Sequence, residues 1–170
     1  MAATNNKAEY AASAAATITL ASLASSSTLV AGRASANIDN SSNKYLDYWV
    51  AGKITVGTTP TANTVIEVWV VPRKNDTPTY HDTFGGTDAA VTVTSREMLI
   101  AYGKLGASIA VPVTTSNVGY EFSFSVADVC RSISPVLFQL FVVHNTGVAL
   151  HATGGNHVID VKGLYSTSGG

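Results

Sequence analysis

The chain has 170 residues, enough for one domain with its own apolar core. Charged residues make up 12% of it, about half the usual share, and the formal net charge is −1. No basic surface is therefore expected for nucleic acid. The single cysteine, Cys130, excludes an intrachain disulfide and is expected to be a small buried apolar residue.

The N-terminal part is rich in alanine and small polar residues. Residues 11–24 superficially resemble a secretory signal, but small residues dominate them and a Lys and a Glu precede them, so we expect no signal peptide. No run reaches the roughly 18 apolar residues that a membrane helix needs. Residues 1–14 lack a periodic apolar pattern. We expect an arm with a first strand over residues 1–30, in contact with a neighbouring subunit, and a domain over residues 31–170.

Along the rest of the chain, short apolar runs alternate with clusters of Gly, Ser, Thr, Asn and Pro. This spacing predicts an all-β fold, an antiparallel β-sandwich of the jelly-roll kind. The clearest strands are residues 45–56 and 64–71, whose apolar residues recur at every second position. The turn-rich residues 57–63 predict a hairpin in which Val56 lies opposite Thr64.

The predicted hairpin has a testable register. Apolar side chains meet on one face, and Lys53 meets Glu67 on the other. The same register places Trp49 and Trp69 on the face opposite the apolar stripe, on neighbouring strands. Two outward indoles could stack on sugar rings or anchor a protein interface, or another part of the chain could cover them. The pattern alone leaves these alternatives open.

Three later segments also have strand patterns. Residues 119–126 alternate between inward aromatic or apolar side chains and outward polar ones. Residues 136–143 are almost continuously apolar, which predicts a strand covered on both faces. Residues 157–165 are expected to form the last strand.

Two short helical turns are predicted. Residues 94–97 have the spacing of a capping box ahead of an apolar run, and Gly103 could end that helix. Residues 126–133 place apolar side chains on one helical face, and Pro135 follows them.

Three of the four histidines lie in residues 144–157. If residues 153–156 turn the chain, His151 and His157 flank the loop, and paired imidazoles can bind zinc or copper. Such a site needs further ligands, and the nearest carboxylate in the sequence is Asp160. We therefore expect polar residues flanking a turn, with no metal site and no cofactor.

No catalytic motif stands out. The sequence has no GxSxG elbow, and the pairs Gly85-Gly86 and Gly154-Gly155 lack the context of a phosphate-binding loop. The eleven carboxylates are dispersed, although two could still meet in space as in a glycosidase. The sequence predicts a protein that is not an enzyme.

Two segments carry a family resemblance. Residues 136–165, with the core VLFQLFVVHNTGVALHATGGNH, and residues 44–71, KYLDYWVAGKITVGTTPTANTVIEVWVV, resemble small β-sandwich structural proteins of tailed bacteriophages. The resemblance implies a capsid decoration or cement protein in the virion, assembled in the host cytoplasm. It also implies homo-oligomers, as trimers, and the major capsid protein or another virion protein as partner. The alternative is a carbohydrate- or receptor-binding tail component that uses Trp49 and Trp69.

Overall fold

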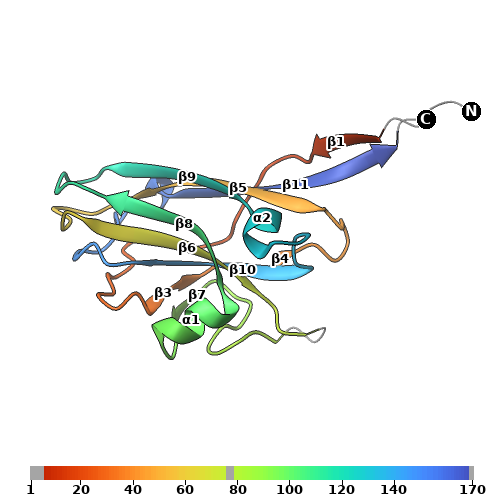
Figure 1. Cartoon of the computed structure of the whole chain (residues 1–170). Helices are drawn as coiled ribbons and strands as arrows, with labels where there is room; N and C mark the ends of the chain where they lie inside the picture. The colour runs from red at the N-terminus through yellow and green to blue at the C-terminus, as the bar shows by residue number, and fades with distance from the viewer. Residues whose placement is uncertain (1–5, 76–78, 169–170) are drawn as a thin grey trace, which may run out of the picture.

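Two antiparallel β-sheets face each other across one core in the computed structural model, which describes residues 6–75 and 79–168 (Figure 1). Sheet A has the order β1-β11-β5-β9, and β2 also pairs with β11. Its strands are β1 (Asn6–Tyr10), β2 (Ala14–Ala15), β5 (Asp47–Thr55), β9 (Gly119–Ser125) and β11 (Val158–Ser168). The predicted all-β sandwich is confirmed, whereas its jelly-roll character stays a prediction.

Sheet B has the order β7-β3-β10-β6-β8, and β4 also pairs with β10. Its strands are β3 (Ala31–Ala34), β4 (Ile38–Asp39), β6 (Thr64–Pro72), β7 (Ala89–Thr92), β8 (Lys104–Val111) and β10 (Leu137–His144). Short helices are α1 (Arg96–Tyr102), α2 (Val126–Cys130) and the 3-10 turn η1 (Gly154–Asn156). None of the described helices is long and apolar enough to cross a membrane.

The main core lies between the sheets and follows the two-residue period of the strands. Every second residue of the central strands points into it, including Val50 and Ile54 of β5 and Val68 of β6. The inward side chains of β9 also pack against this core, as the alternation of residues 119–126 predicts. Cys130 packs at its margin and is half-buried, so it is less enclosed than the sequence predicts.

A second apolar cluster covers the outer face of sheet B. Trp69, Phe141 and Val143 pack there against Leu99 and Tyr102 of α1, together with residues that precede the helix. Strand β10 is therefore covered on both faces, and all eight of its residues are buried. This confirms the interpretation of residues 137–143 as a strand enclosed on both sides, whereas Val136 lies outside the strand and is exposed.

The predicted hairpin of residues 45–71 is wrong. Strand β5 pairs with β11 and β9, whereas β6 pairs with β10 and β8 in the other sheet. Residues 57–63 cross from one sheet to the other instead of turning the chain back. Lys53 lies opposite Glu121 rather than Glu67, and Val56 forms a bridge with Leu150 rather than with Thr64.

Both predicted helical turns are confirmed, with one change in a cap. The Met98 amide donates to the hydroxyl of Ser95 over 3.2 Å, so Ser95 caps α1 and Thr94 does not. The Gly103 amide donates to the Leu99 carbonyl over 2.8 Å and ends the helix. Helix α2 covers only residues 126–130 of the predicted 126–133, because Arg131, whose backbone is left-handed with φ 53, caps it well ahead of the proline.

The N-terminal segment runs along the last strand of the chain. Asn6 pairs with Ser168 at one end of this ladder, and Ala15 pairs with Asp160 at the other. This segment is thus held in place by pairing with β11 of the same chain. The sequence analysis expected a neighbouring subunit to hold it. Residues 1–5 of the expected arm lie outside the described residues. In Figure 1, β1 and the end of β11 extend beyond the body of the sandwich.

Candidate functional site

The two tryptophans do not share a face, because their strands belong to different sheets. Trp69 lies on the outer face of sheet B beneath α1 and is only 4% exposed. Its indole Nε1 donates to Oε2 of Glu67 over 2.9 Å, and the Arg96 guanidinium lies 4.9 Å from the ring centre. The interpretation of Trp69 as a glycan or interface residue is therefore wrong, since the same chain covers it.

Glu67 and Arg96 form an ion pair that the sequence did not reveal. The two guanidinium nitrogens Nη1 and Nη2 donate to the two carboxylate oxygens over 2.6 and 2.7 Å. The carboxylate is nearly buried and the guanidinium is about a quarter exposed. This geometry attaches α1 to sheet B. The only sequence signal was a charged residue in the middle of an apolar strand.

Trp49 lies on the outward face of sheet A and is 39% exposed. The strand registers place side chains there in three rows that cross β11, β5 and β9 in that order. The rows are Lys162, Trp49 and Ser125; then Asp160, Ala51 and Ser123; then Val158, Lys53 and Glu121. The middle row therefore has the shorter side chains, and the rows on either side stand above it.

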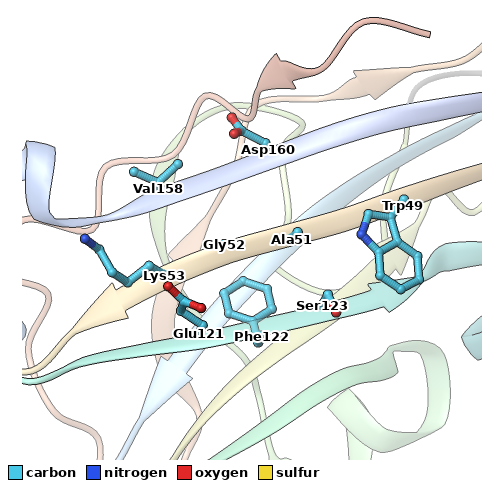
Figure 2. A pocket seen from close by; sticks show the side chains of 9 residues that line it. All are labelled: Trp49, Ala51, Gly52, Lys53, Glu121, Phe122, Ser123, Val158 and Asp160. Carbon is cyan, nitrogen blue, oxygen red and sulfur yellow. The ribbon is translucent and has the colours of Figure 1, made fainter. Parts of the chain in front are cut away.

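A shallow groove of about 670 Å³ follows this arrangement (Figure 2). We call it the Trp49 groove. Its lining residues are Trp49, Ala51, Gly52, Lys53, Glu121, Phe122, Ser123, Val158 and Asp160. Figure 2 shows the indole of Trp49 at one end, Lys53 and Glu121 at the other, and Asp160 on β11, apart from the other side chains.

The polar side chains of the Trp49 groove are unpaired within the described part of the chain. Lys53, Glu121, Ser123 and Asp160 form no side-chain hydrogen bond or ion pair with another described residue. Their donors and acceptors are thus available to a ligand. The lining has one lysine and two carboxylates, and Lys162 stands next to Trp49 in the first row, so the charges around the groove balance.

His151 and His157 come together, as the loop prediction suggested, but they serve the packing of that loop. Nδ1 of His157 accepts from the Thr55 amide over 3.3 Å, and its Nε2 contacts the His151 carbonyl at 2.9 Å. Nδ1 of His151 accepts from the Thr153 amide over 3.0 Å. Burial lowers the pKa of His157. The described residues include no group of three or more His, Cys, Asp or Glu able to hold a metal ion.

A third histidine, His144, is fully buried at the end of β10. Its Nδ1 lies 2.9 Å from the hydroxyl of Thr146, and its Nε2 lies 3.0 Å from the carbonyl of Leu23. Burial lowers the pKa of His144 to about 4, so the ring is neutral at pH 7. Its role is to connect β10 to two loops.

The sandwich also has an exposed apolar end, which we define by Leu46, Ile133 and Val136. Their side chains are 49%, 67% and 47% exposed. The Ser134 amide donates to the Leu46 carbonyl over 3.0 Å, which joins the two loops that carry these residues. The sequence patterns placed all three residues inside predicted strands or a helix, residues 45–56, 126–133 and 136–143, and so gave no sign of this surface.

A second hollow of about 520 Å³ lies where β1 and β11 leave the body, with Tyr45, Leu46 and Tyr165 in its lining. Leu46 is thus shared by this hollow and the apolar end.

Comparisons with protein-family models, curated proteins and solved structures find no match for the chain.

Proposed function

We propose that this chain is a non-enzymatic structural protein of a tailed-phage virion, a decoration or cement protein that forms trimers and binds the major capsid protein. The resemblance of residues 44–71 and 136–165 supports the protein class. The observation that carries the proposal is the two-stranded extension of sheet A beside the exposed apolar end (Figure 1). A jelly-roll order of strands is part of the same proposal.

The extension consists of the ends of β1 and β11, which pair only with each other in the described structure. Strand β11 pairs with β5 as far as Leu164 opposite Asp47, whereas its pairing with β1 continues to Ser168 opposite Asn6. Beyond Leu164 the described structure is thus a ribbon of two strands. Such a ribbon is marginally stable in water unless a third strand or a packed surface supports it. A neighbouring subunit would supply that support.

The apolar end lies at the base of this ribbon and fits the same role. Tyr10 of β1 is 56% exposed, and Leu46 lies in the hollow between the ribbon and the apolar end. The low charge of the chain reduces the cost of bringing copies together. A second copy of this chain is the proposed occupant, because each copy presents both surfaces and a ring of three would use them all.

The oligomeric state tests this occupant. In native mass spectrometry we expect a trimer for the wild type and a monomer for the double variant Leu46→Ser/Ile133→Ser, with both keeping the same circular dichroism spectrum. The control is Ile100→Ser, which changes a residue of α1 that is 56% exposed and away from the ribbon. A trimer that survives the double variant, or a monomeric wild type, would contradict the proposal.

Binding to a shell tests the function itself. We expect the protein to sediment with shells of the phage whose genome encodes it. A chain without residues 1–10 lacks β1 but keeps the rest of both sheets, so it should retain its far-ultraviolet spectrum and lose attachment. Full attachment of the truncated chain would remove the ribbon from the proposal, and no attachment of the intact chain would overturn the proposed function.

The alternative, a carbohydrate- or receptor-binding tail component, relied on two outward tryptophans. Only Trp49 is accessible in the structure, and Trp69 is held under α1. A ligand site built from both tryptophans is therefore incompatible with the structure.

A further inference from the structure

We infer that the Trp49 groove binds a neutral saccharide. This binding site goes beyond the structural role and does not depend on it, because the groove lies on the flat face of sheet A and the ribbon lies at its end. Three features of the groove support binding of a sugar: the shape set by the three rows of side chains, the accessible indole, and the unpaired polar groups.

The shape of the groove suits a short sugar chain. The middle row has the short side chains of Ala51 and Ser123, with Trp49 in the row on one side and Lys53 in the row on the other. Neighbouring strands lie about 4.8 Å apart, so the groove spans roughly 10 Å from β11 to β9. That span accommodates about two pyranose rings laid across the strands.

The indole supplies the apolar contact that a sugar ring requires. One face of a pyranose presents C–H groups, and an accessible aromatic ring with one polar edge packs against such a face. Trp49 is the one exposed aromatic side chain in the lining, and Figure 2 shows its ring beside the floor of the groove. A sugar could thus stack on the indole and extend over Ala51 towards Ser123.

The polar groups fit sugar hydroxyls. Carboxylate oxygens accept hydrogen bonds from hydroxyl groups, and such charge-assisted bonds are stronger than those between neutral groups. Asp160 lies at the β11 end of the middle row, and Glu121 lies at the β9 end of the next row. Lys53 can donate to a hydroxyl oxygen between them. Because Lys162 beside Trp49 balances the second carboxylate, the charges around the groove sum to zero, which favours a neutral sugar over a charged one.

The same features argue against a protein partner at this site. The centre of a protein interface is depleted of charged residues and rich in packed apolar ones. Here Trp49 and Val158 are the only large exposed apolar side chains in the lining, and three charged side chains surround them. Burial under a protein would leave those charges without water unless the partner paired each one.

The test is a titration with maltohexaose, cellohexaose and chitohexaose, followed through the indole N–H signals in proton–nitrogen NMR spectra. We expect at least one of these sugars to shift the Trp49 signal and none to shift that of Trp69, which serves as a control within the same molecule. Trp49→Ala should weaken binding about tenfold. No shift of Trp49 with any of the three sugars would overturn the inference.

Three further variants test the chemistry. Glu121→Gln and Asp160→Asn keep the size of each side chain and should weaken binding severalfold, whereas Ala51→Leu should abolish it by filling the floor without changing charge. Met98→Ala, an exposed change on α1, should have no effect. Undiminished binding by Ala51→Leu, or binding of polygalacturonate in preference to the neutral sugars, would contradict the inference. Neither result depends on whether the protein is a trimer or attaches to shells.

Discussion

The two sheets of the sandwich differ in whether their outer faces are covered by other parts of the chain. Sheet B covers its outer face with α1 and the residues before it, so Trp69 is buried there and hydrogen-bonded to Glu67. Sheet A leaves its outer face open, so Trp49 stands beside a groove. Both tryptophans occupy outward positions of their strands, and Trp69 directly follows a register shift between β6 and β8. The segment that connects two strands therefore decides whether an outward tryptophan is buried and stabilises the fold or is free to bind a ligand.

Truncating each tryptophan should give the largest contrast. We expect Trp69→Ala to lower the free energy of unfolding by about 3–5 kcal/mol, because it removes a buried ring from a packed cluster. Trp49→Ala should cost less than about 1 kcal/mol, since its ring is partly in water. Urea unfolding at equilibrium measures both values. Similar losses would show that the outer faces do not differ as described.

Acidification should have the next largest effect on stability, through the buried imidazole of His144 at the end of β10 in sheet B. The pKa of His144 is about 4 in the folded chain and about 6.5 unfolded, so the unfolded state binds a proton first as the pH falls. Stability should therefore decrease between pH 6.5 and pH 4, by up to about 3 kcal/mol. His157, whose pKa is also lowered by burial, adds to the effect in the same direction.

Urea unfolding across this pH range measures the effect, with His144→Gln as the comparison. The glutamine variant cannot take up the proton and should show a shallower dependence on pH than the wild type. An unchanged dependence would assign the effect to other groups.

Removing the guanidinium of Arg96 should weaken the cover of sheet B somewhat less. Arg96→Ala leaves the Glu67 carboxylate nearly buried without its partner, and we expect a loss of about 2–3 kcal/mol because the arginine is partly exposed. The double variant Glu67→Gln/Arg96→Met removes both charges and should recover part of the loss. Thermal and urea unfolding of the three proteins would measure this. A single variant as stable as the wild type would show that the pair does not hold α1 in place.

The corresponding charges on sheet A should have the smallest effect. Lys53 and Glu121 are cross-strand neighbours without a salt bridge in the described structure. We expect Lys53→Met and Glu121→Gln to change the free energy of unfolding by less than about 0.5 kcal/mol each. Larger losses in urea unfolding would mean that this face contributes to the fold.

The elements that sequence patterns predicted correctly are those whose environment acts on each residue separately. The continuous apolar run of β10 required burial on both faces, and the alternation of β9 required one buried face. Both ends of α1 were predicted to within one residue, because the cap at its start, Ser95, and the glycine at its end, Gly103, act through local hydrogen bonds. Such signals do not depend on which strands become neighbours.

The pairing of β5 with β6 failed because matching side chains do not identify a unique partner. Lys53 finds an opposite charge in Glu121 as readily as in Glu67, and the apolar stripe of β5 packs against β6 across the core instead of beside it. The error carried over to the candidate site, since it placed Trp69 next to Trp49. The Trp49 groove itself depends on β9 and β11, which lie far along the chain, so no local pattern could reveal it.

The position of β11 has a consequence for how the protein is made. This strand lies inside sheet A, between β5 on one side and β1 and β2 on the other. During synthesis, β1 and β2 therefore lack this partner until residues 158–168 have left the ribosome. Contacts between distant parts of a chain form slowly, and unpaired edges can bind wrong partners meanwhile. A chain cut short before residue 158 would lack the strand that joins β1 and β2 to β5 and β9. We expect such products to aggregate or to be degraded.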